Sequence, residues 1–346
     1  MLIIIIIIKF LLISLFFLSI LFYIRKFLHG SKNYLKHSLQ NKFIIITGAN
    51  SGIGKQTALN LLSENAKIIF ACRNKTRALE LINSLSKNKQ NAIFIELDLC
   101  DFNSIKTFSN IIIKNYPKID ILINNAGAQP IEFNLTKDKY DTYLQGNFLG
   151  PSLLTFLLIP HMNKNSRIIN VSSLGHYFSD LNEEINNNNN NIIFNDLDRF
   201  KKKYYSNEIG KFNLYFTTKL MIIFLTEFLA EFFIKKGNLI KIVSLHPGII
   251  NSEYLRFLNN YKIIYKIFIF VQPIWNFFAK NCEEGAQTQL FLSYVDWNEI
   301  VNGGYYSECK LSLFSKKVRN KKLKKKIVDW TINEINKNGF KFNFNI

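Results

Sequence analysis

The sequence has few cysteines, and none of them is spaced as a metal ligand. The four of them contain no C-x-x-C pair, and no cluster of histidines accompanies them: Cys72, Cys100, Cys282 and Cys309. The pattern therefore predicts neither a disulfide framework nor a metal site, and it fits reduced thiols in a cytosolic environment.

Acidic residues are scarce as well. Against 44 Lys and Arg there are 25 Asp and Glu, so the 346-residue chain has a net charge of +19. Charge informs about partners and not about the fold. A basic surface suits a phosphate-rich cofactor, anionic lipid or nucleic acid. Because the sequence contains no recognised nucleic-acid-binding module, we expect no nucleic-acid partner.

The N-terminal residues 2–24 contain a single charged side chain, Lys9. As a helix this run would span roughly 30 Å of hydrocarbon. Basic residues follow it at Arg25 and Lys26, which places the rest of the chain on the cytoplasmic side under the positive-inside rule. We predict a single-pass transmembrane anchor at 1–26, followed by a linker at 27–40.

Two other interpretations of this run are weaker. A cleaved signal peptide would need a small-x-small cleavage site soon after the run and basic residues before it, and neither is present. A buried core helix would show an opposite polar face, which the run lacks.

From Lys42 onward, short β-branched runs alternate with helical patterns. This alternation is typical of a parallel sheet covered by helices on both faces. We expect a single doubly wound (Rossmann-type) α/β domain over 41–335 and a tail at 336–346. The expected strands are Phe43–Thr47, Lys67–Cys72, Ala92–Leu97, Ile119–Asn124, Arg167–Ser172, Ile240–Leu245 and Gly304–Tyr306.

Three segments stand apart from this alternation. Residues 180–195 contain the asparagine run Asn186–Asn191, and we expect a disordered insertion there. Residues 254–280 are rich in Phe, Ile, Tyr and Trp, which fits core packing or an apolar lid over a lipophilic substrate that also touches the membrane. The basic segment 316–326 fits a solvated helix face or a contact with anionic lipid.

Glycines separate the first expected strand from the helix that follows it. They permit a tight turn and a close approach of the backbone to a pyrophosphate, which the helix N-terminus also attracts. The expected cofactor-binding residues here are Gly48, Ser51, Gly52, Ile53 and Gly54.

Arg73 follows the second expected strand, and no acidic residue occurs there before Glu80. An NAD site usually has an acid at this place for the ribose 2′-OH, whereas an arginine suits the 2′-phosphate of NADP. We therefore favour NADP over NAD. Asp98, after the third strand, is placed to hydrogen-bond the adenine or to cap its own loop.

Polar residues also follow the fourth and fifth expected strands. The sequence Asn124-Asn-Ala-Gly127 fits either a cofactor contact by Asn125, Ala126 and Gly127 or an ordinary turn. Ser172-Ser173 comes next along the chain. Its hydroxyl groups could hold a substrate oxygen, or cap the following turn.

Tyr215 and Lys219 lie four positions apart, on one face of an expected helix that opens at Tyr215 and ends near Ile234. The ammonium group favours the phenolate, so we expect it to lower the pKa of Tyr215 and suit that phenol to proton transfer. A second copy of the spacing, Tyr306 and Lys310, follows the last strand without helical periodicity and is set aside.

In this order, these motifs resemble the short-chain dehydrogenases/reductases over about residues 40–335, and within them the membrane-anchored retinol dehydrogenase group. The motifs are Thr47-Gly-Ala-Asn-Ser-Gly-Ile-Gly54-Lys, Ala-Cys-Arg73-Asn, Asn124-Asn-Ala-Gly127, Gly-Asn147-Phe-Leu-Gly, Ile-Ile-Asn-Val-Ser-Ser173, Tyr215-Phe-Thr-Thr-Lys219-Leu, Ser-Leu-His-Pro247-Gly248, Glu284-Gly-Ala-Gln-Thr and Gly-Gly-Tyr-Tyr-Ser-Glu-Cys.

The resemblance implies a role for each matching residue. Tyr215 would be the general acid/base, and Lys219 would also bind the nicotinamide ribose. Ser173 would position the carbonyl group, and Asn147 would hold a water chain behind Lys219. Pro247 and Gly248 would line the nicotinamide site.

The chain departs from the group at two places. Thr218 stands where the group usually has serine, and the stretch between Ser173 and Tyr215 is lengthened by the asparagine run. His176 and His246 lie in matching segments, and we interpret both as structural.

The resemblance further implies an NADP(H)-dependent oxidoreductase for a lipophilic substrate such as a retinoid, steroid or fatty aldehyde. The endoplasmic reticulum is the expected membrane, and a homodimer is compatible with the family. Two alternatives stay open, namely a tethered cofactor-binding or scaffold protein without turnover, and a reductase of polar carbonyl metabolites.

Overall fold

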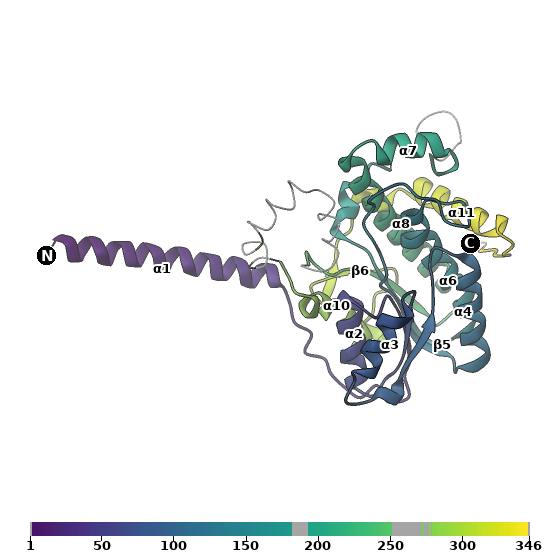
Figure 1. The fold of residues 1–346 in the computed structure, drawn as a ribbon, viewed down its shortest axis with the longest axis horizontal. Helices are drawn as coiled ribbons and strands as arrows, with labels where there is room; N and C mark the ends of the chain where they lie inside the picture. The colour runs from purple at the N-terminus through teal and green to yellow at the C-terminus, as the bar shows by residue number, and fades with distance from the viewer. Residues whose placement is uncertain (1, 182–192, 251–271, 273–276, 278, 345–346) are drawn as a thin grey trace.

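The computed structural model describes residues 2–181, 193–250, 272, 277 and 279–344 (Figure 1). Its strands are β1 (Phe43–Thr47), β2 (Lys67–Cys72), β3 (Ala92–Glu96), β4 (Ile119–Asn124), β5 (Met162–Val171), β6 (Lys241–His246), β7 (Tyr305–Ser307) and β8 (Lys310–Ser312). They form one sheet in the order β3-β2-β1-β4-β5-β6-β7-β8. All neighbours are parallel except β7 and β8, which are antiparallel. The predicted single Rossmann-type α/β domain is confirmed.

Helices cover both faces of this sheet, because its central strands are apolar on both sides. The helices are α1 (Leu2–His29), α2 (Gly52–Ser63), α3 (Lys75–Asn83), α4 (Phe102–Asn115), α5 (Thr142–Leu144), α6 (Gly150–Leu158), α7 (Leu197–Tyr205), α8 (Glu208–Lys235), α10 (Cys282–Tyr294) and α11 (Lys321–Lys337). One core lies between the sheet and α2, α3 and α10, and the other between the sheet and α4, α6 and α8. Figure 1 shows the two layers on opposite sides of the strands.

Helix α8 crosses the second core and is buried along most of its length. The helix begins at Glu208, because the Asn207 side chain accepts a hydrogen bond from the backbone N–H of Gly210. The expectation that Tyr215 opens this helix was therefore wrong, since two further turns precede it. The consequence is that Tyr215 and Lys219 sit inside a long, anchored helix.

The sheet edge beyond β6 differs from expectation. Strand β8 pairs with β7 through a two-residue turn, so Tyr306 and Lys310 lie on neighbouring strands and do not share a helix face. Strand β5 begins at Met162, earlier than the expected Arg167.

The asparagine run lies outside the described residues, although Leu181 and Ile193 on either side of it are buried. Most of 254–280 also lies outside them.

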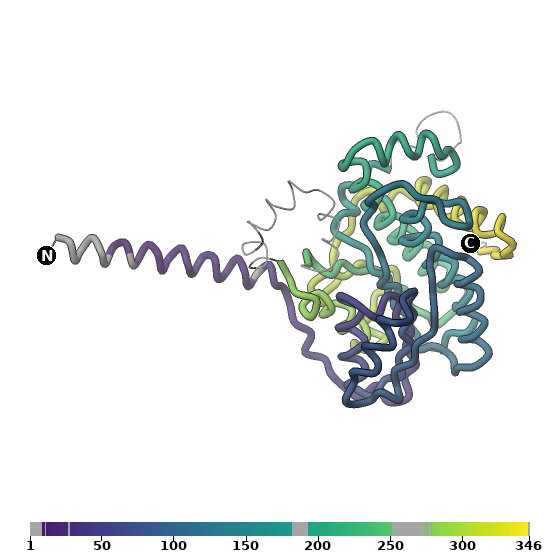
Figure 2. Tube along the Cα trace, in the orientation of Figure 1, coloured from purple at the N-terminus to yellow at the C-terminus, as the bar shows by residue number. Residues whose placement is uncertain are grey.

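The N-terminal helix α1 projects away from the body, and the linker that follows this helix runs over the body to the start of β1 (Figures 1 and 2). The described side chains between Phe10 and Ile24 are almost all exposed, including Phe10, Leu15 and Phe22. Within the part of the chain that the structure describes, no helix meets the length and apolarity needed to cross a bilayer.

Candidate active site

The loops that follow β1, β4, β5 and β6 meet at the carboxyl edge of the sheet. Because neighbouring parallel strands run in the same direction, the residues that follow each strand lie together at one edge of the sheet. Most of the site residues expected from the sequence lie in these loops, at the start of α2 or on α8, whereas Arg73, Asp98 and Asn147 lie on other segments.

The glycine loop between β1 and α2 leaves the start of α2 open. Ser51 is the N-cap residue, yet its side chain makes no capping hydrogen bond. A Cβ atom added at Gly54 would lie 2.4 Å from Asn125 Nδ2 and 2.5 Å from the Gly48 carbonyl oxygen, so only glycine fits there. Uncapped backbone N–H groups at a helix start attract anions. Beside them, Ser51, Gly52, Lys55 and Arg77 help line a cavity of about 490 Å³.

The loop after β2 holds Arg73 at the surface. Its side chain is exposed and has no ion-pair partner among the described residues. The Asn50 side chain joins this loop to the glycine loop by donating to the Asn74 carbonyl at 3.4 Å. The arginine is therefore available to an anion bound beside the glycine loop.

Asp98, two residues after β3, is half-buried and accepts a hydrogen bond from the Cys100 N–H at 2.9 Å. This contact is the loop-capping alternative for Asp98. A contact with adenine stays a prediction.

The turn Asn124–Gly127 is tied firmly to the sheet. Thr47 Oγ1 accepts hydrogen bonds from the N–H groups of Asn125 and Ala126, both at 3.0 Å. The Asn125 amide donates to the Thr47 carbonyl at 3.0 Å and accepts from Gln289 at 3.1 Å. The side chain of Asn125 is thus occupied by protein partners, and its backbone is what remains to face a cofactor. The sequence gives no signal of this role for Thr47, because a threonine at the end of a strand is common.

Lys219 is the buried cation of the site. The residue is 3% exposed, and its Nζ donates to the Val171 carbonyl at 2.8 Å. Burial lowers the pKa of Lys219 to about 8, so the side chain is still mainly protonated at neutral pH. The Lys219 Nζ lies 5.5 Å from the ring centroid of Tyr215, which is half-buried on the same helix. The structure thus brings these two side chains close together, and their joint role in proton transfer stays a prediction.

Asn147 and Gly127 complete the surroundings of this lysine. Asn147 lies in a π-helical turn, Gln145–Leu149. Its side-chain amide accepts a hydrogen bond from the Ala128 N–H and donates one to the Ala128 carbonyl, both at 2.8 Å. A Cβ atom added at Gly127 would lie 3.2 Å from Lys219 Nζ and 3.6 Å from Asn147 Oδ1. The fold therefore brings these three residues together, as π-helical turns often do at functional sites.

Ser173 begins the loop after β5, and its Oγ accepts from the Gly175 N–H at 3.1 Å. Its neighbour Ser172 instead donates to the Lys219 carbonyl at 2.8 Å and is fully buried. Of the two serines, Ser173 is the one that stays accessible at the sheet edge.

Two histidines hold the Ser173 loop from behind. His246 Nδ1 accepts from the Leu174 N–H at 3.1 Å, and burial lowers the pKa of His246 to about 4. His176 contacts the Ser173 carbonyl at 2.7 Å through Nδ1 and accepts from the Ser315 N–H at 3.0 Å through Nε2. Burial also lowers the pKa of His176. Both rings are neutral backbone partners, in agreement with their structural interpretation.

Pro247 and Gly248 follow β6, with Gly248 at a φ of +98°. A Cβ atom added at Gly248 would lie 2.6 Å from Lys280 Cδ, so this loop rests on the Lys280 side chain. The sequence offered no motif for Lys280, because it lies at the end of the apolar segment and becomes a neighbour of Gly248 only in the fold.

The four cysteines are free thiols. Burial raises the pKa of Cys72, Cys100 and Cys309 to about 11 in each case. Among the described residues, no group of three or more His, Cys, Asp or Glu side chains is arranged to hold a metal ion.

Comparisons with known proteins agree with this geometry. A family model described as short chain dehydrogenase matches residues 42–179. Human retinol dehydrogenase 12 is 31% identical over 313 residues, covering 89% of this chain and 90% of that protein. Mouse retinol dehydrogenase 11 is 32% identical over 312 residues, covering 88% and 90%. The structure of salutaridine reductase from Papaver somniferum matches with a TM-score of 0.58 at 21% identity, covering 77% of this chain and 100% of that one.

Proposed function

The chain belongs to the short-chain dehydrogenase family, and from this premise we propose that it interconverts a lipophilic carbonyl compound and its alcohol with NADP(H). Membership makes it an oxidoreductase that uses a nicotinamide cofactor, and its relatives are retinol dehydrogenases. The observation that carries the proposal is the buried ammonium group of Lys219 beside Tyr215, at the sheet edge where Ser173 and the glycine loop also lie.

The residues at this edge fit a phosphorylated dinucleotide. The open start of α2 at Ser51–Gly54 suits the pyrophosphate. The exposed Arg73, which has no ion-pair partner in the described part of the chain, suits a 2′-phosphate. Among the described residues, no acidic side chain between β2 and Glu80 stands ready for a free 2′-OH. Asp98 would lie near the adenine, the backbone of Asn125–Gly127 near the ribose, and Pro247–Gly248 near the nicotinamide.

When bound at this edge, the nicotinamide cofactor would supply a hydride for reduction of the carbonyl carbon. Ser173 Oγ holds the carbonyl oxygen, and Tyr215 donates its phenolic proton to that oxygen. The phenolate left behind is stabilised by the ammonium group of Lys219. Asn147 would support a water chain that returns a proton behind Lys219. In the oxidation, Tyr215 takes the proton of the alcohol instead.

Apolar side chains near this edge support a lipophilic substrate. Phe178 is 67% exposed and packs on Phe216, with ring centroids 5.9 Å apart, next to the catalytic helix turn. Leu174 and Phe212 are exposed on the same loop and helix. The names of the relatives favour a retinoid, and steroids and fatty aldehydes fit the same chemistry. Cytosolic NADPH favours reduction as the direction.

We also propose that α1 anchors the protein in a membrane, with the domain facing the cytosol and the endoplasmic reticulum as its location. The exposed Phe, Leu and Ile side chains of α1 support this, since water offers them no partner. Arg25 and Lys26 follow on the proposed cytosolic side. The basic segment 316–326 would add contacts to anionic lipid.

One assay tests the activity. The full chain in detergent micelles is given NADPH or NADH with retinal, a keto steroid, an aliphatic aldehyde or a polar sugar aldehyde, and cofactor oxidation is measured. We expect consumption of NADPH with the lipophilic carbonyls. Binding of NADPH without turnover of any carbonyl would instead indicate a scaffold protein, and turnover confined to the sugar would exclude a lipophilic substrate.

A further inference from the structure

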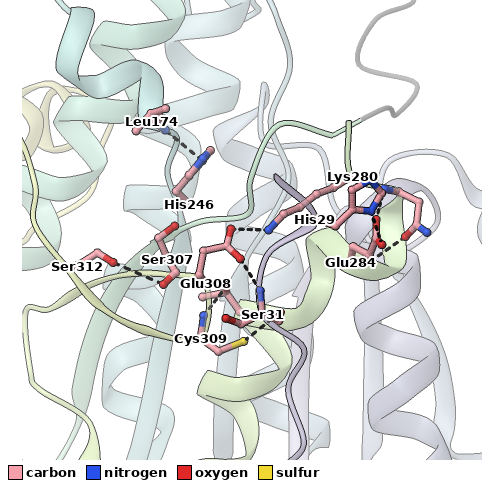
Figure 3. Close-up of polar contacts among 12 residues, drawn as sticks. His29, Ser31, Leu174, His246, Lys280, Glu284, Ser307, Glu308, Cys309 and Ser312 are labelled. Carbon is pink, nitrogen blue, oxygen red and sulfur yellow. Dashed lines mark hydrogen bonds and ion pairs between the residues drawn. The ribbon is translucent and has the colours of Figure 1, made fainter. Parts of the chain in front are cut away.

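The linker that follows α1 is held against the body by side chains next to the proposed nicotinamide site (Figure 3). His29 Nδ1 contacts Glu284 Oε1 at 2.6 Å, and the Ser31 N–H donates to Glu308 Oε2 at 2.8 Å. The Asn33 N–H donates to Gln287 Oε1 at 2.9 Å. These partners lie on α10 and in the turn between β7 and β8, so the linker is fixed over this part of the domain.

Glu308 is shared between the linker and a buried lysine. Its second carboxylate oxygen accepts a hydrogen bond from Lys280 Nζ, and the Lys280 side chain is only 4% exposed. A Cβ atom added at Gly30 would lie 1.6 Å from Glu308 Oε2, which shows how closely the linker backbone approaches the carboxylate. One acidic side chain thus joins two segments that are far apart in the sequence.

Lys280 in turn supports the loop after β6. Its N–H donates to the Ile249 carbonyl at 2.9 Å, and its stem lies against Gly248. The positive charge of Lys280 adds to burial in lowering the pKa of His246. Movement of Lys280 would therefore change the position of Pro247–Gly248.

The turn that carries Glu308 has a backbone conformation that glutamate rarely adopts. Glu308 and Cys309 have φ values of +54° and +58°, where residues other than glycine are uncommon. Asn-Gly would suit such a two-residue turn better. The backbone conformation therefore does not explain why a glutamate stands at this position. Its hydrogen bonds with Ser31 and Lys280 do.

We propose that Lys280 and Glu308 are positioning residues for the nicotinamide half of the cofactor, and that the linker through Ser31 holds them in place. The inference rests on the proposed function, because it assumes that Pro247–Gly248 faces the nicotinamide. A buried cation without its carboxylate partner is strongly unfavourable, so losing Glu308 displaces Lys280 and the loop that rests on it.

The test compares binding of two probes to the full chain in detergent micelles. NADPH contains the nicotinamide, whereas 2′-phospho-ADP-ribose lacks it and therefore has no group to contact Pro247–Gly248. Glu308→Gln keeps the shape of the side chain, Lys280→Met keeps the apolar stem, and Ser31→Pro removes the N–H donor. Lys325→Met is the matched control, since Lys325 pairs with Asp329 on the exposed side of α11.

We expect the dissociation constant of NADPH to rise about tenfold in Glu308→Gln and Lys280→Met, and kcat to fall with it. The dissociation constant of 2′-phospho-ADP-ribose should stay within about twofold, because this probe lacks the nicotinamide that Pro247–Gly248 would face. Ser31→Pro should shift NADPH binding in the same direction. Lys325→Met should bind both probes as the wild type does.

The contrary results are distinct. Equal weakening of both probes, together with a lower thermal midpoint, would mean that the pair only stabilises the fold. Unchanged NADPH binding in both Glu308→Gln and Lys280→Met would overturn the proposal, and an effect in these two but not in Ser31→Pro would remove the linker from it. A wild type that binds NADPH without turnover refutes the proposed function alone, because the comparison of probes still tests this inference.

Discussion

At the scale of single residues, the proposed chemistry depends on the phenol of Tyr215. Tyr215→Phe removes the transferable proton and keeps the ring, so turnover should fall by at least about a hundredfold. NADPH binding should persist, because Lys219 and the glycine loop are untouched. Steady-state rates and fluorescence titration with NADPH measure the two effects. Retained turnover would exclude Tyr215 from the proton transfer.

The buried charge of Lys219 lowers the free energy of unfolding, whereas the proposed turnover requires that charge. The pKa of Lys219 in the folded chain, about 8, lies below its ordinary value of 10.5, so the unfolded chain binds more protons between these pH values. The free energy of unfolding should therefore rise with pH across that window. Lys219→Met removes a buried charge and should stabilise the fold by about 1–3 kcal/mol at pH 7, while abolishing turnover. Thermal unfolding and rate assays between pH 6 and 10 test this, and a less stable variant would contradict it.

Arg73 should decide the choice between the two cofactors. Arg73→Asp replaces a partner of the 2′-phosphate by a partner of the 2′-OH, so the ratio of kcat/KM for NADPH over NADH should fall by about tenfold or more. Arg319→Asp, at an exposed site near the C-terminus, is a charge-matched control. An unchanged ratio in Arg73→Asp would place recognition of the phosphate elsewhere, for instance at Lys55 or Arg77.

At the scale of elements, the loop after β5 depends on a histidine from β6. His246→Ala leaves the Leu174 N–H without its acceptor and should lower kcat severalfold and the free energy of unfolding by about 1–3 kcal/mol. His246→Asn keeps an acceptor near the position of Nδ1 and should restore part of both. Because the pKa of His246 is lowered to about 4, wild-type stability should fall as pH drops from 6.5 towards 4. Equal behaviour of the two variants would mean that the hydrogen bond to Leu174 is unimportant.

The central strands and the catalytic motifs could be read from the sequence, because they depend on local patterns. Ile44–Ile46 is an unbroken apolar run, which is typical of a parallel strand buried on both faces. The four-residue spacing of Tyr215 and Lys219 similarly needs only a helix. What escaped were features set by distant contacts, such as the start of α8 at Glu208 and the short strand β8. Lys280 belongs with these, since only the fold places it beneath Gly248.

At the scale of the whole molecule, the proposed membrane attachment depends on α1, which projects from the domain. We expect the full chain to float with phosphatidylcholine vesicles in a density gradient and to resist extraction by high salt and alkaline carbonate. Replacing Leu15 and Phe16 by Arg should release it while NADPH binding persists, since a charge within hydrocarbon costs about 2.5 kcal/mol or more. Extraction of the wild type by salt alone would indicate attachment through charge rather than through α1.

The raised pKa values of three thiols limit the reaction of this protein with electrophilic carbonyl compounds. Aldehydes and unsaturated carbonyls are electrophiles, and thiolates are the groups in proteins that they modify most readily. The pKa of each of Cys72, Cys100 and Cys309 is about 11, so the fraction of each thiol that is ionised at neutral pH is on the order of 10⁻⁴. If the protein acts on carbonyl compounds as proposed, these three thiols stay almost entirely protonated beside them, including Cys72 at the end of β2 next to the glycine loop.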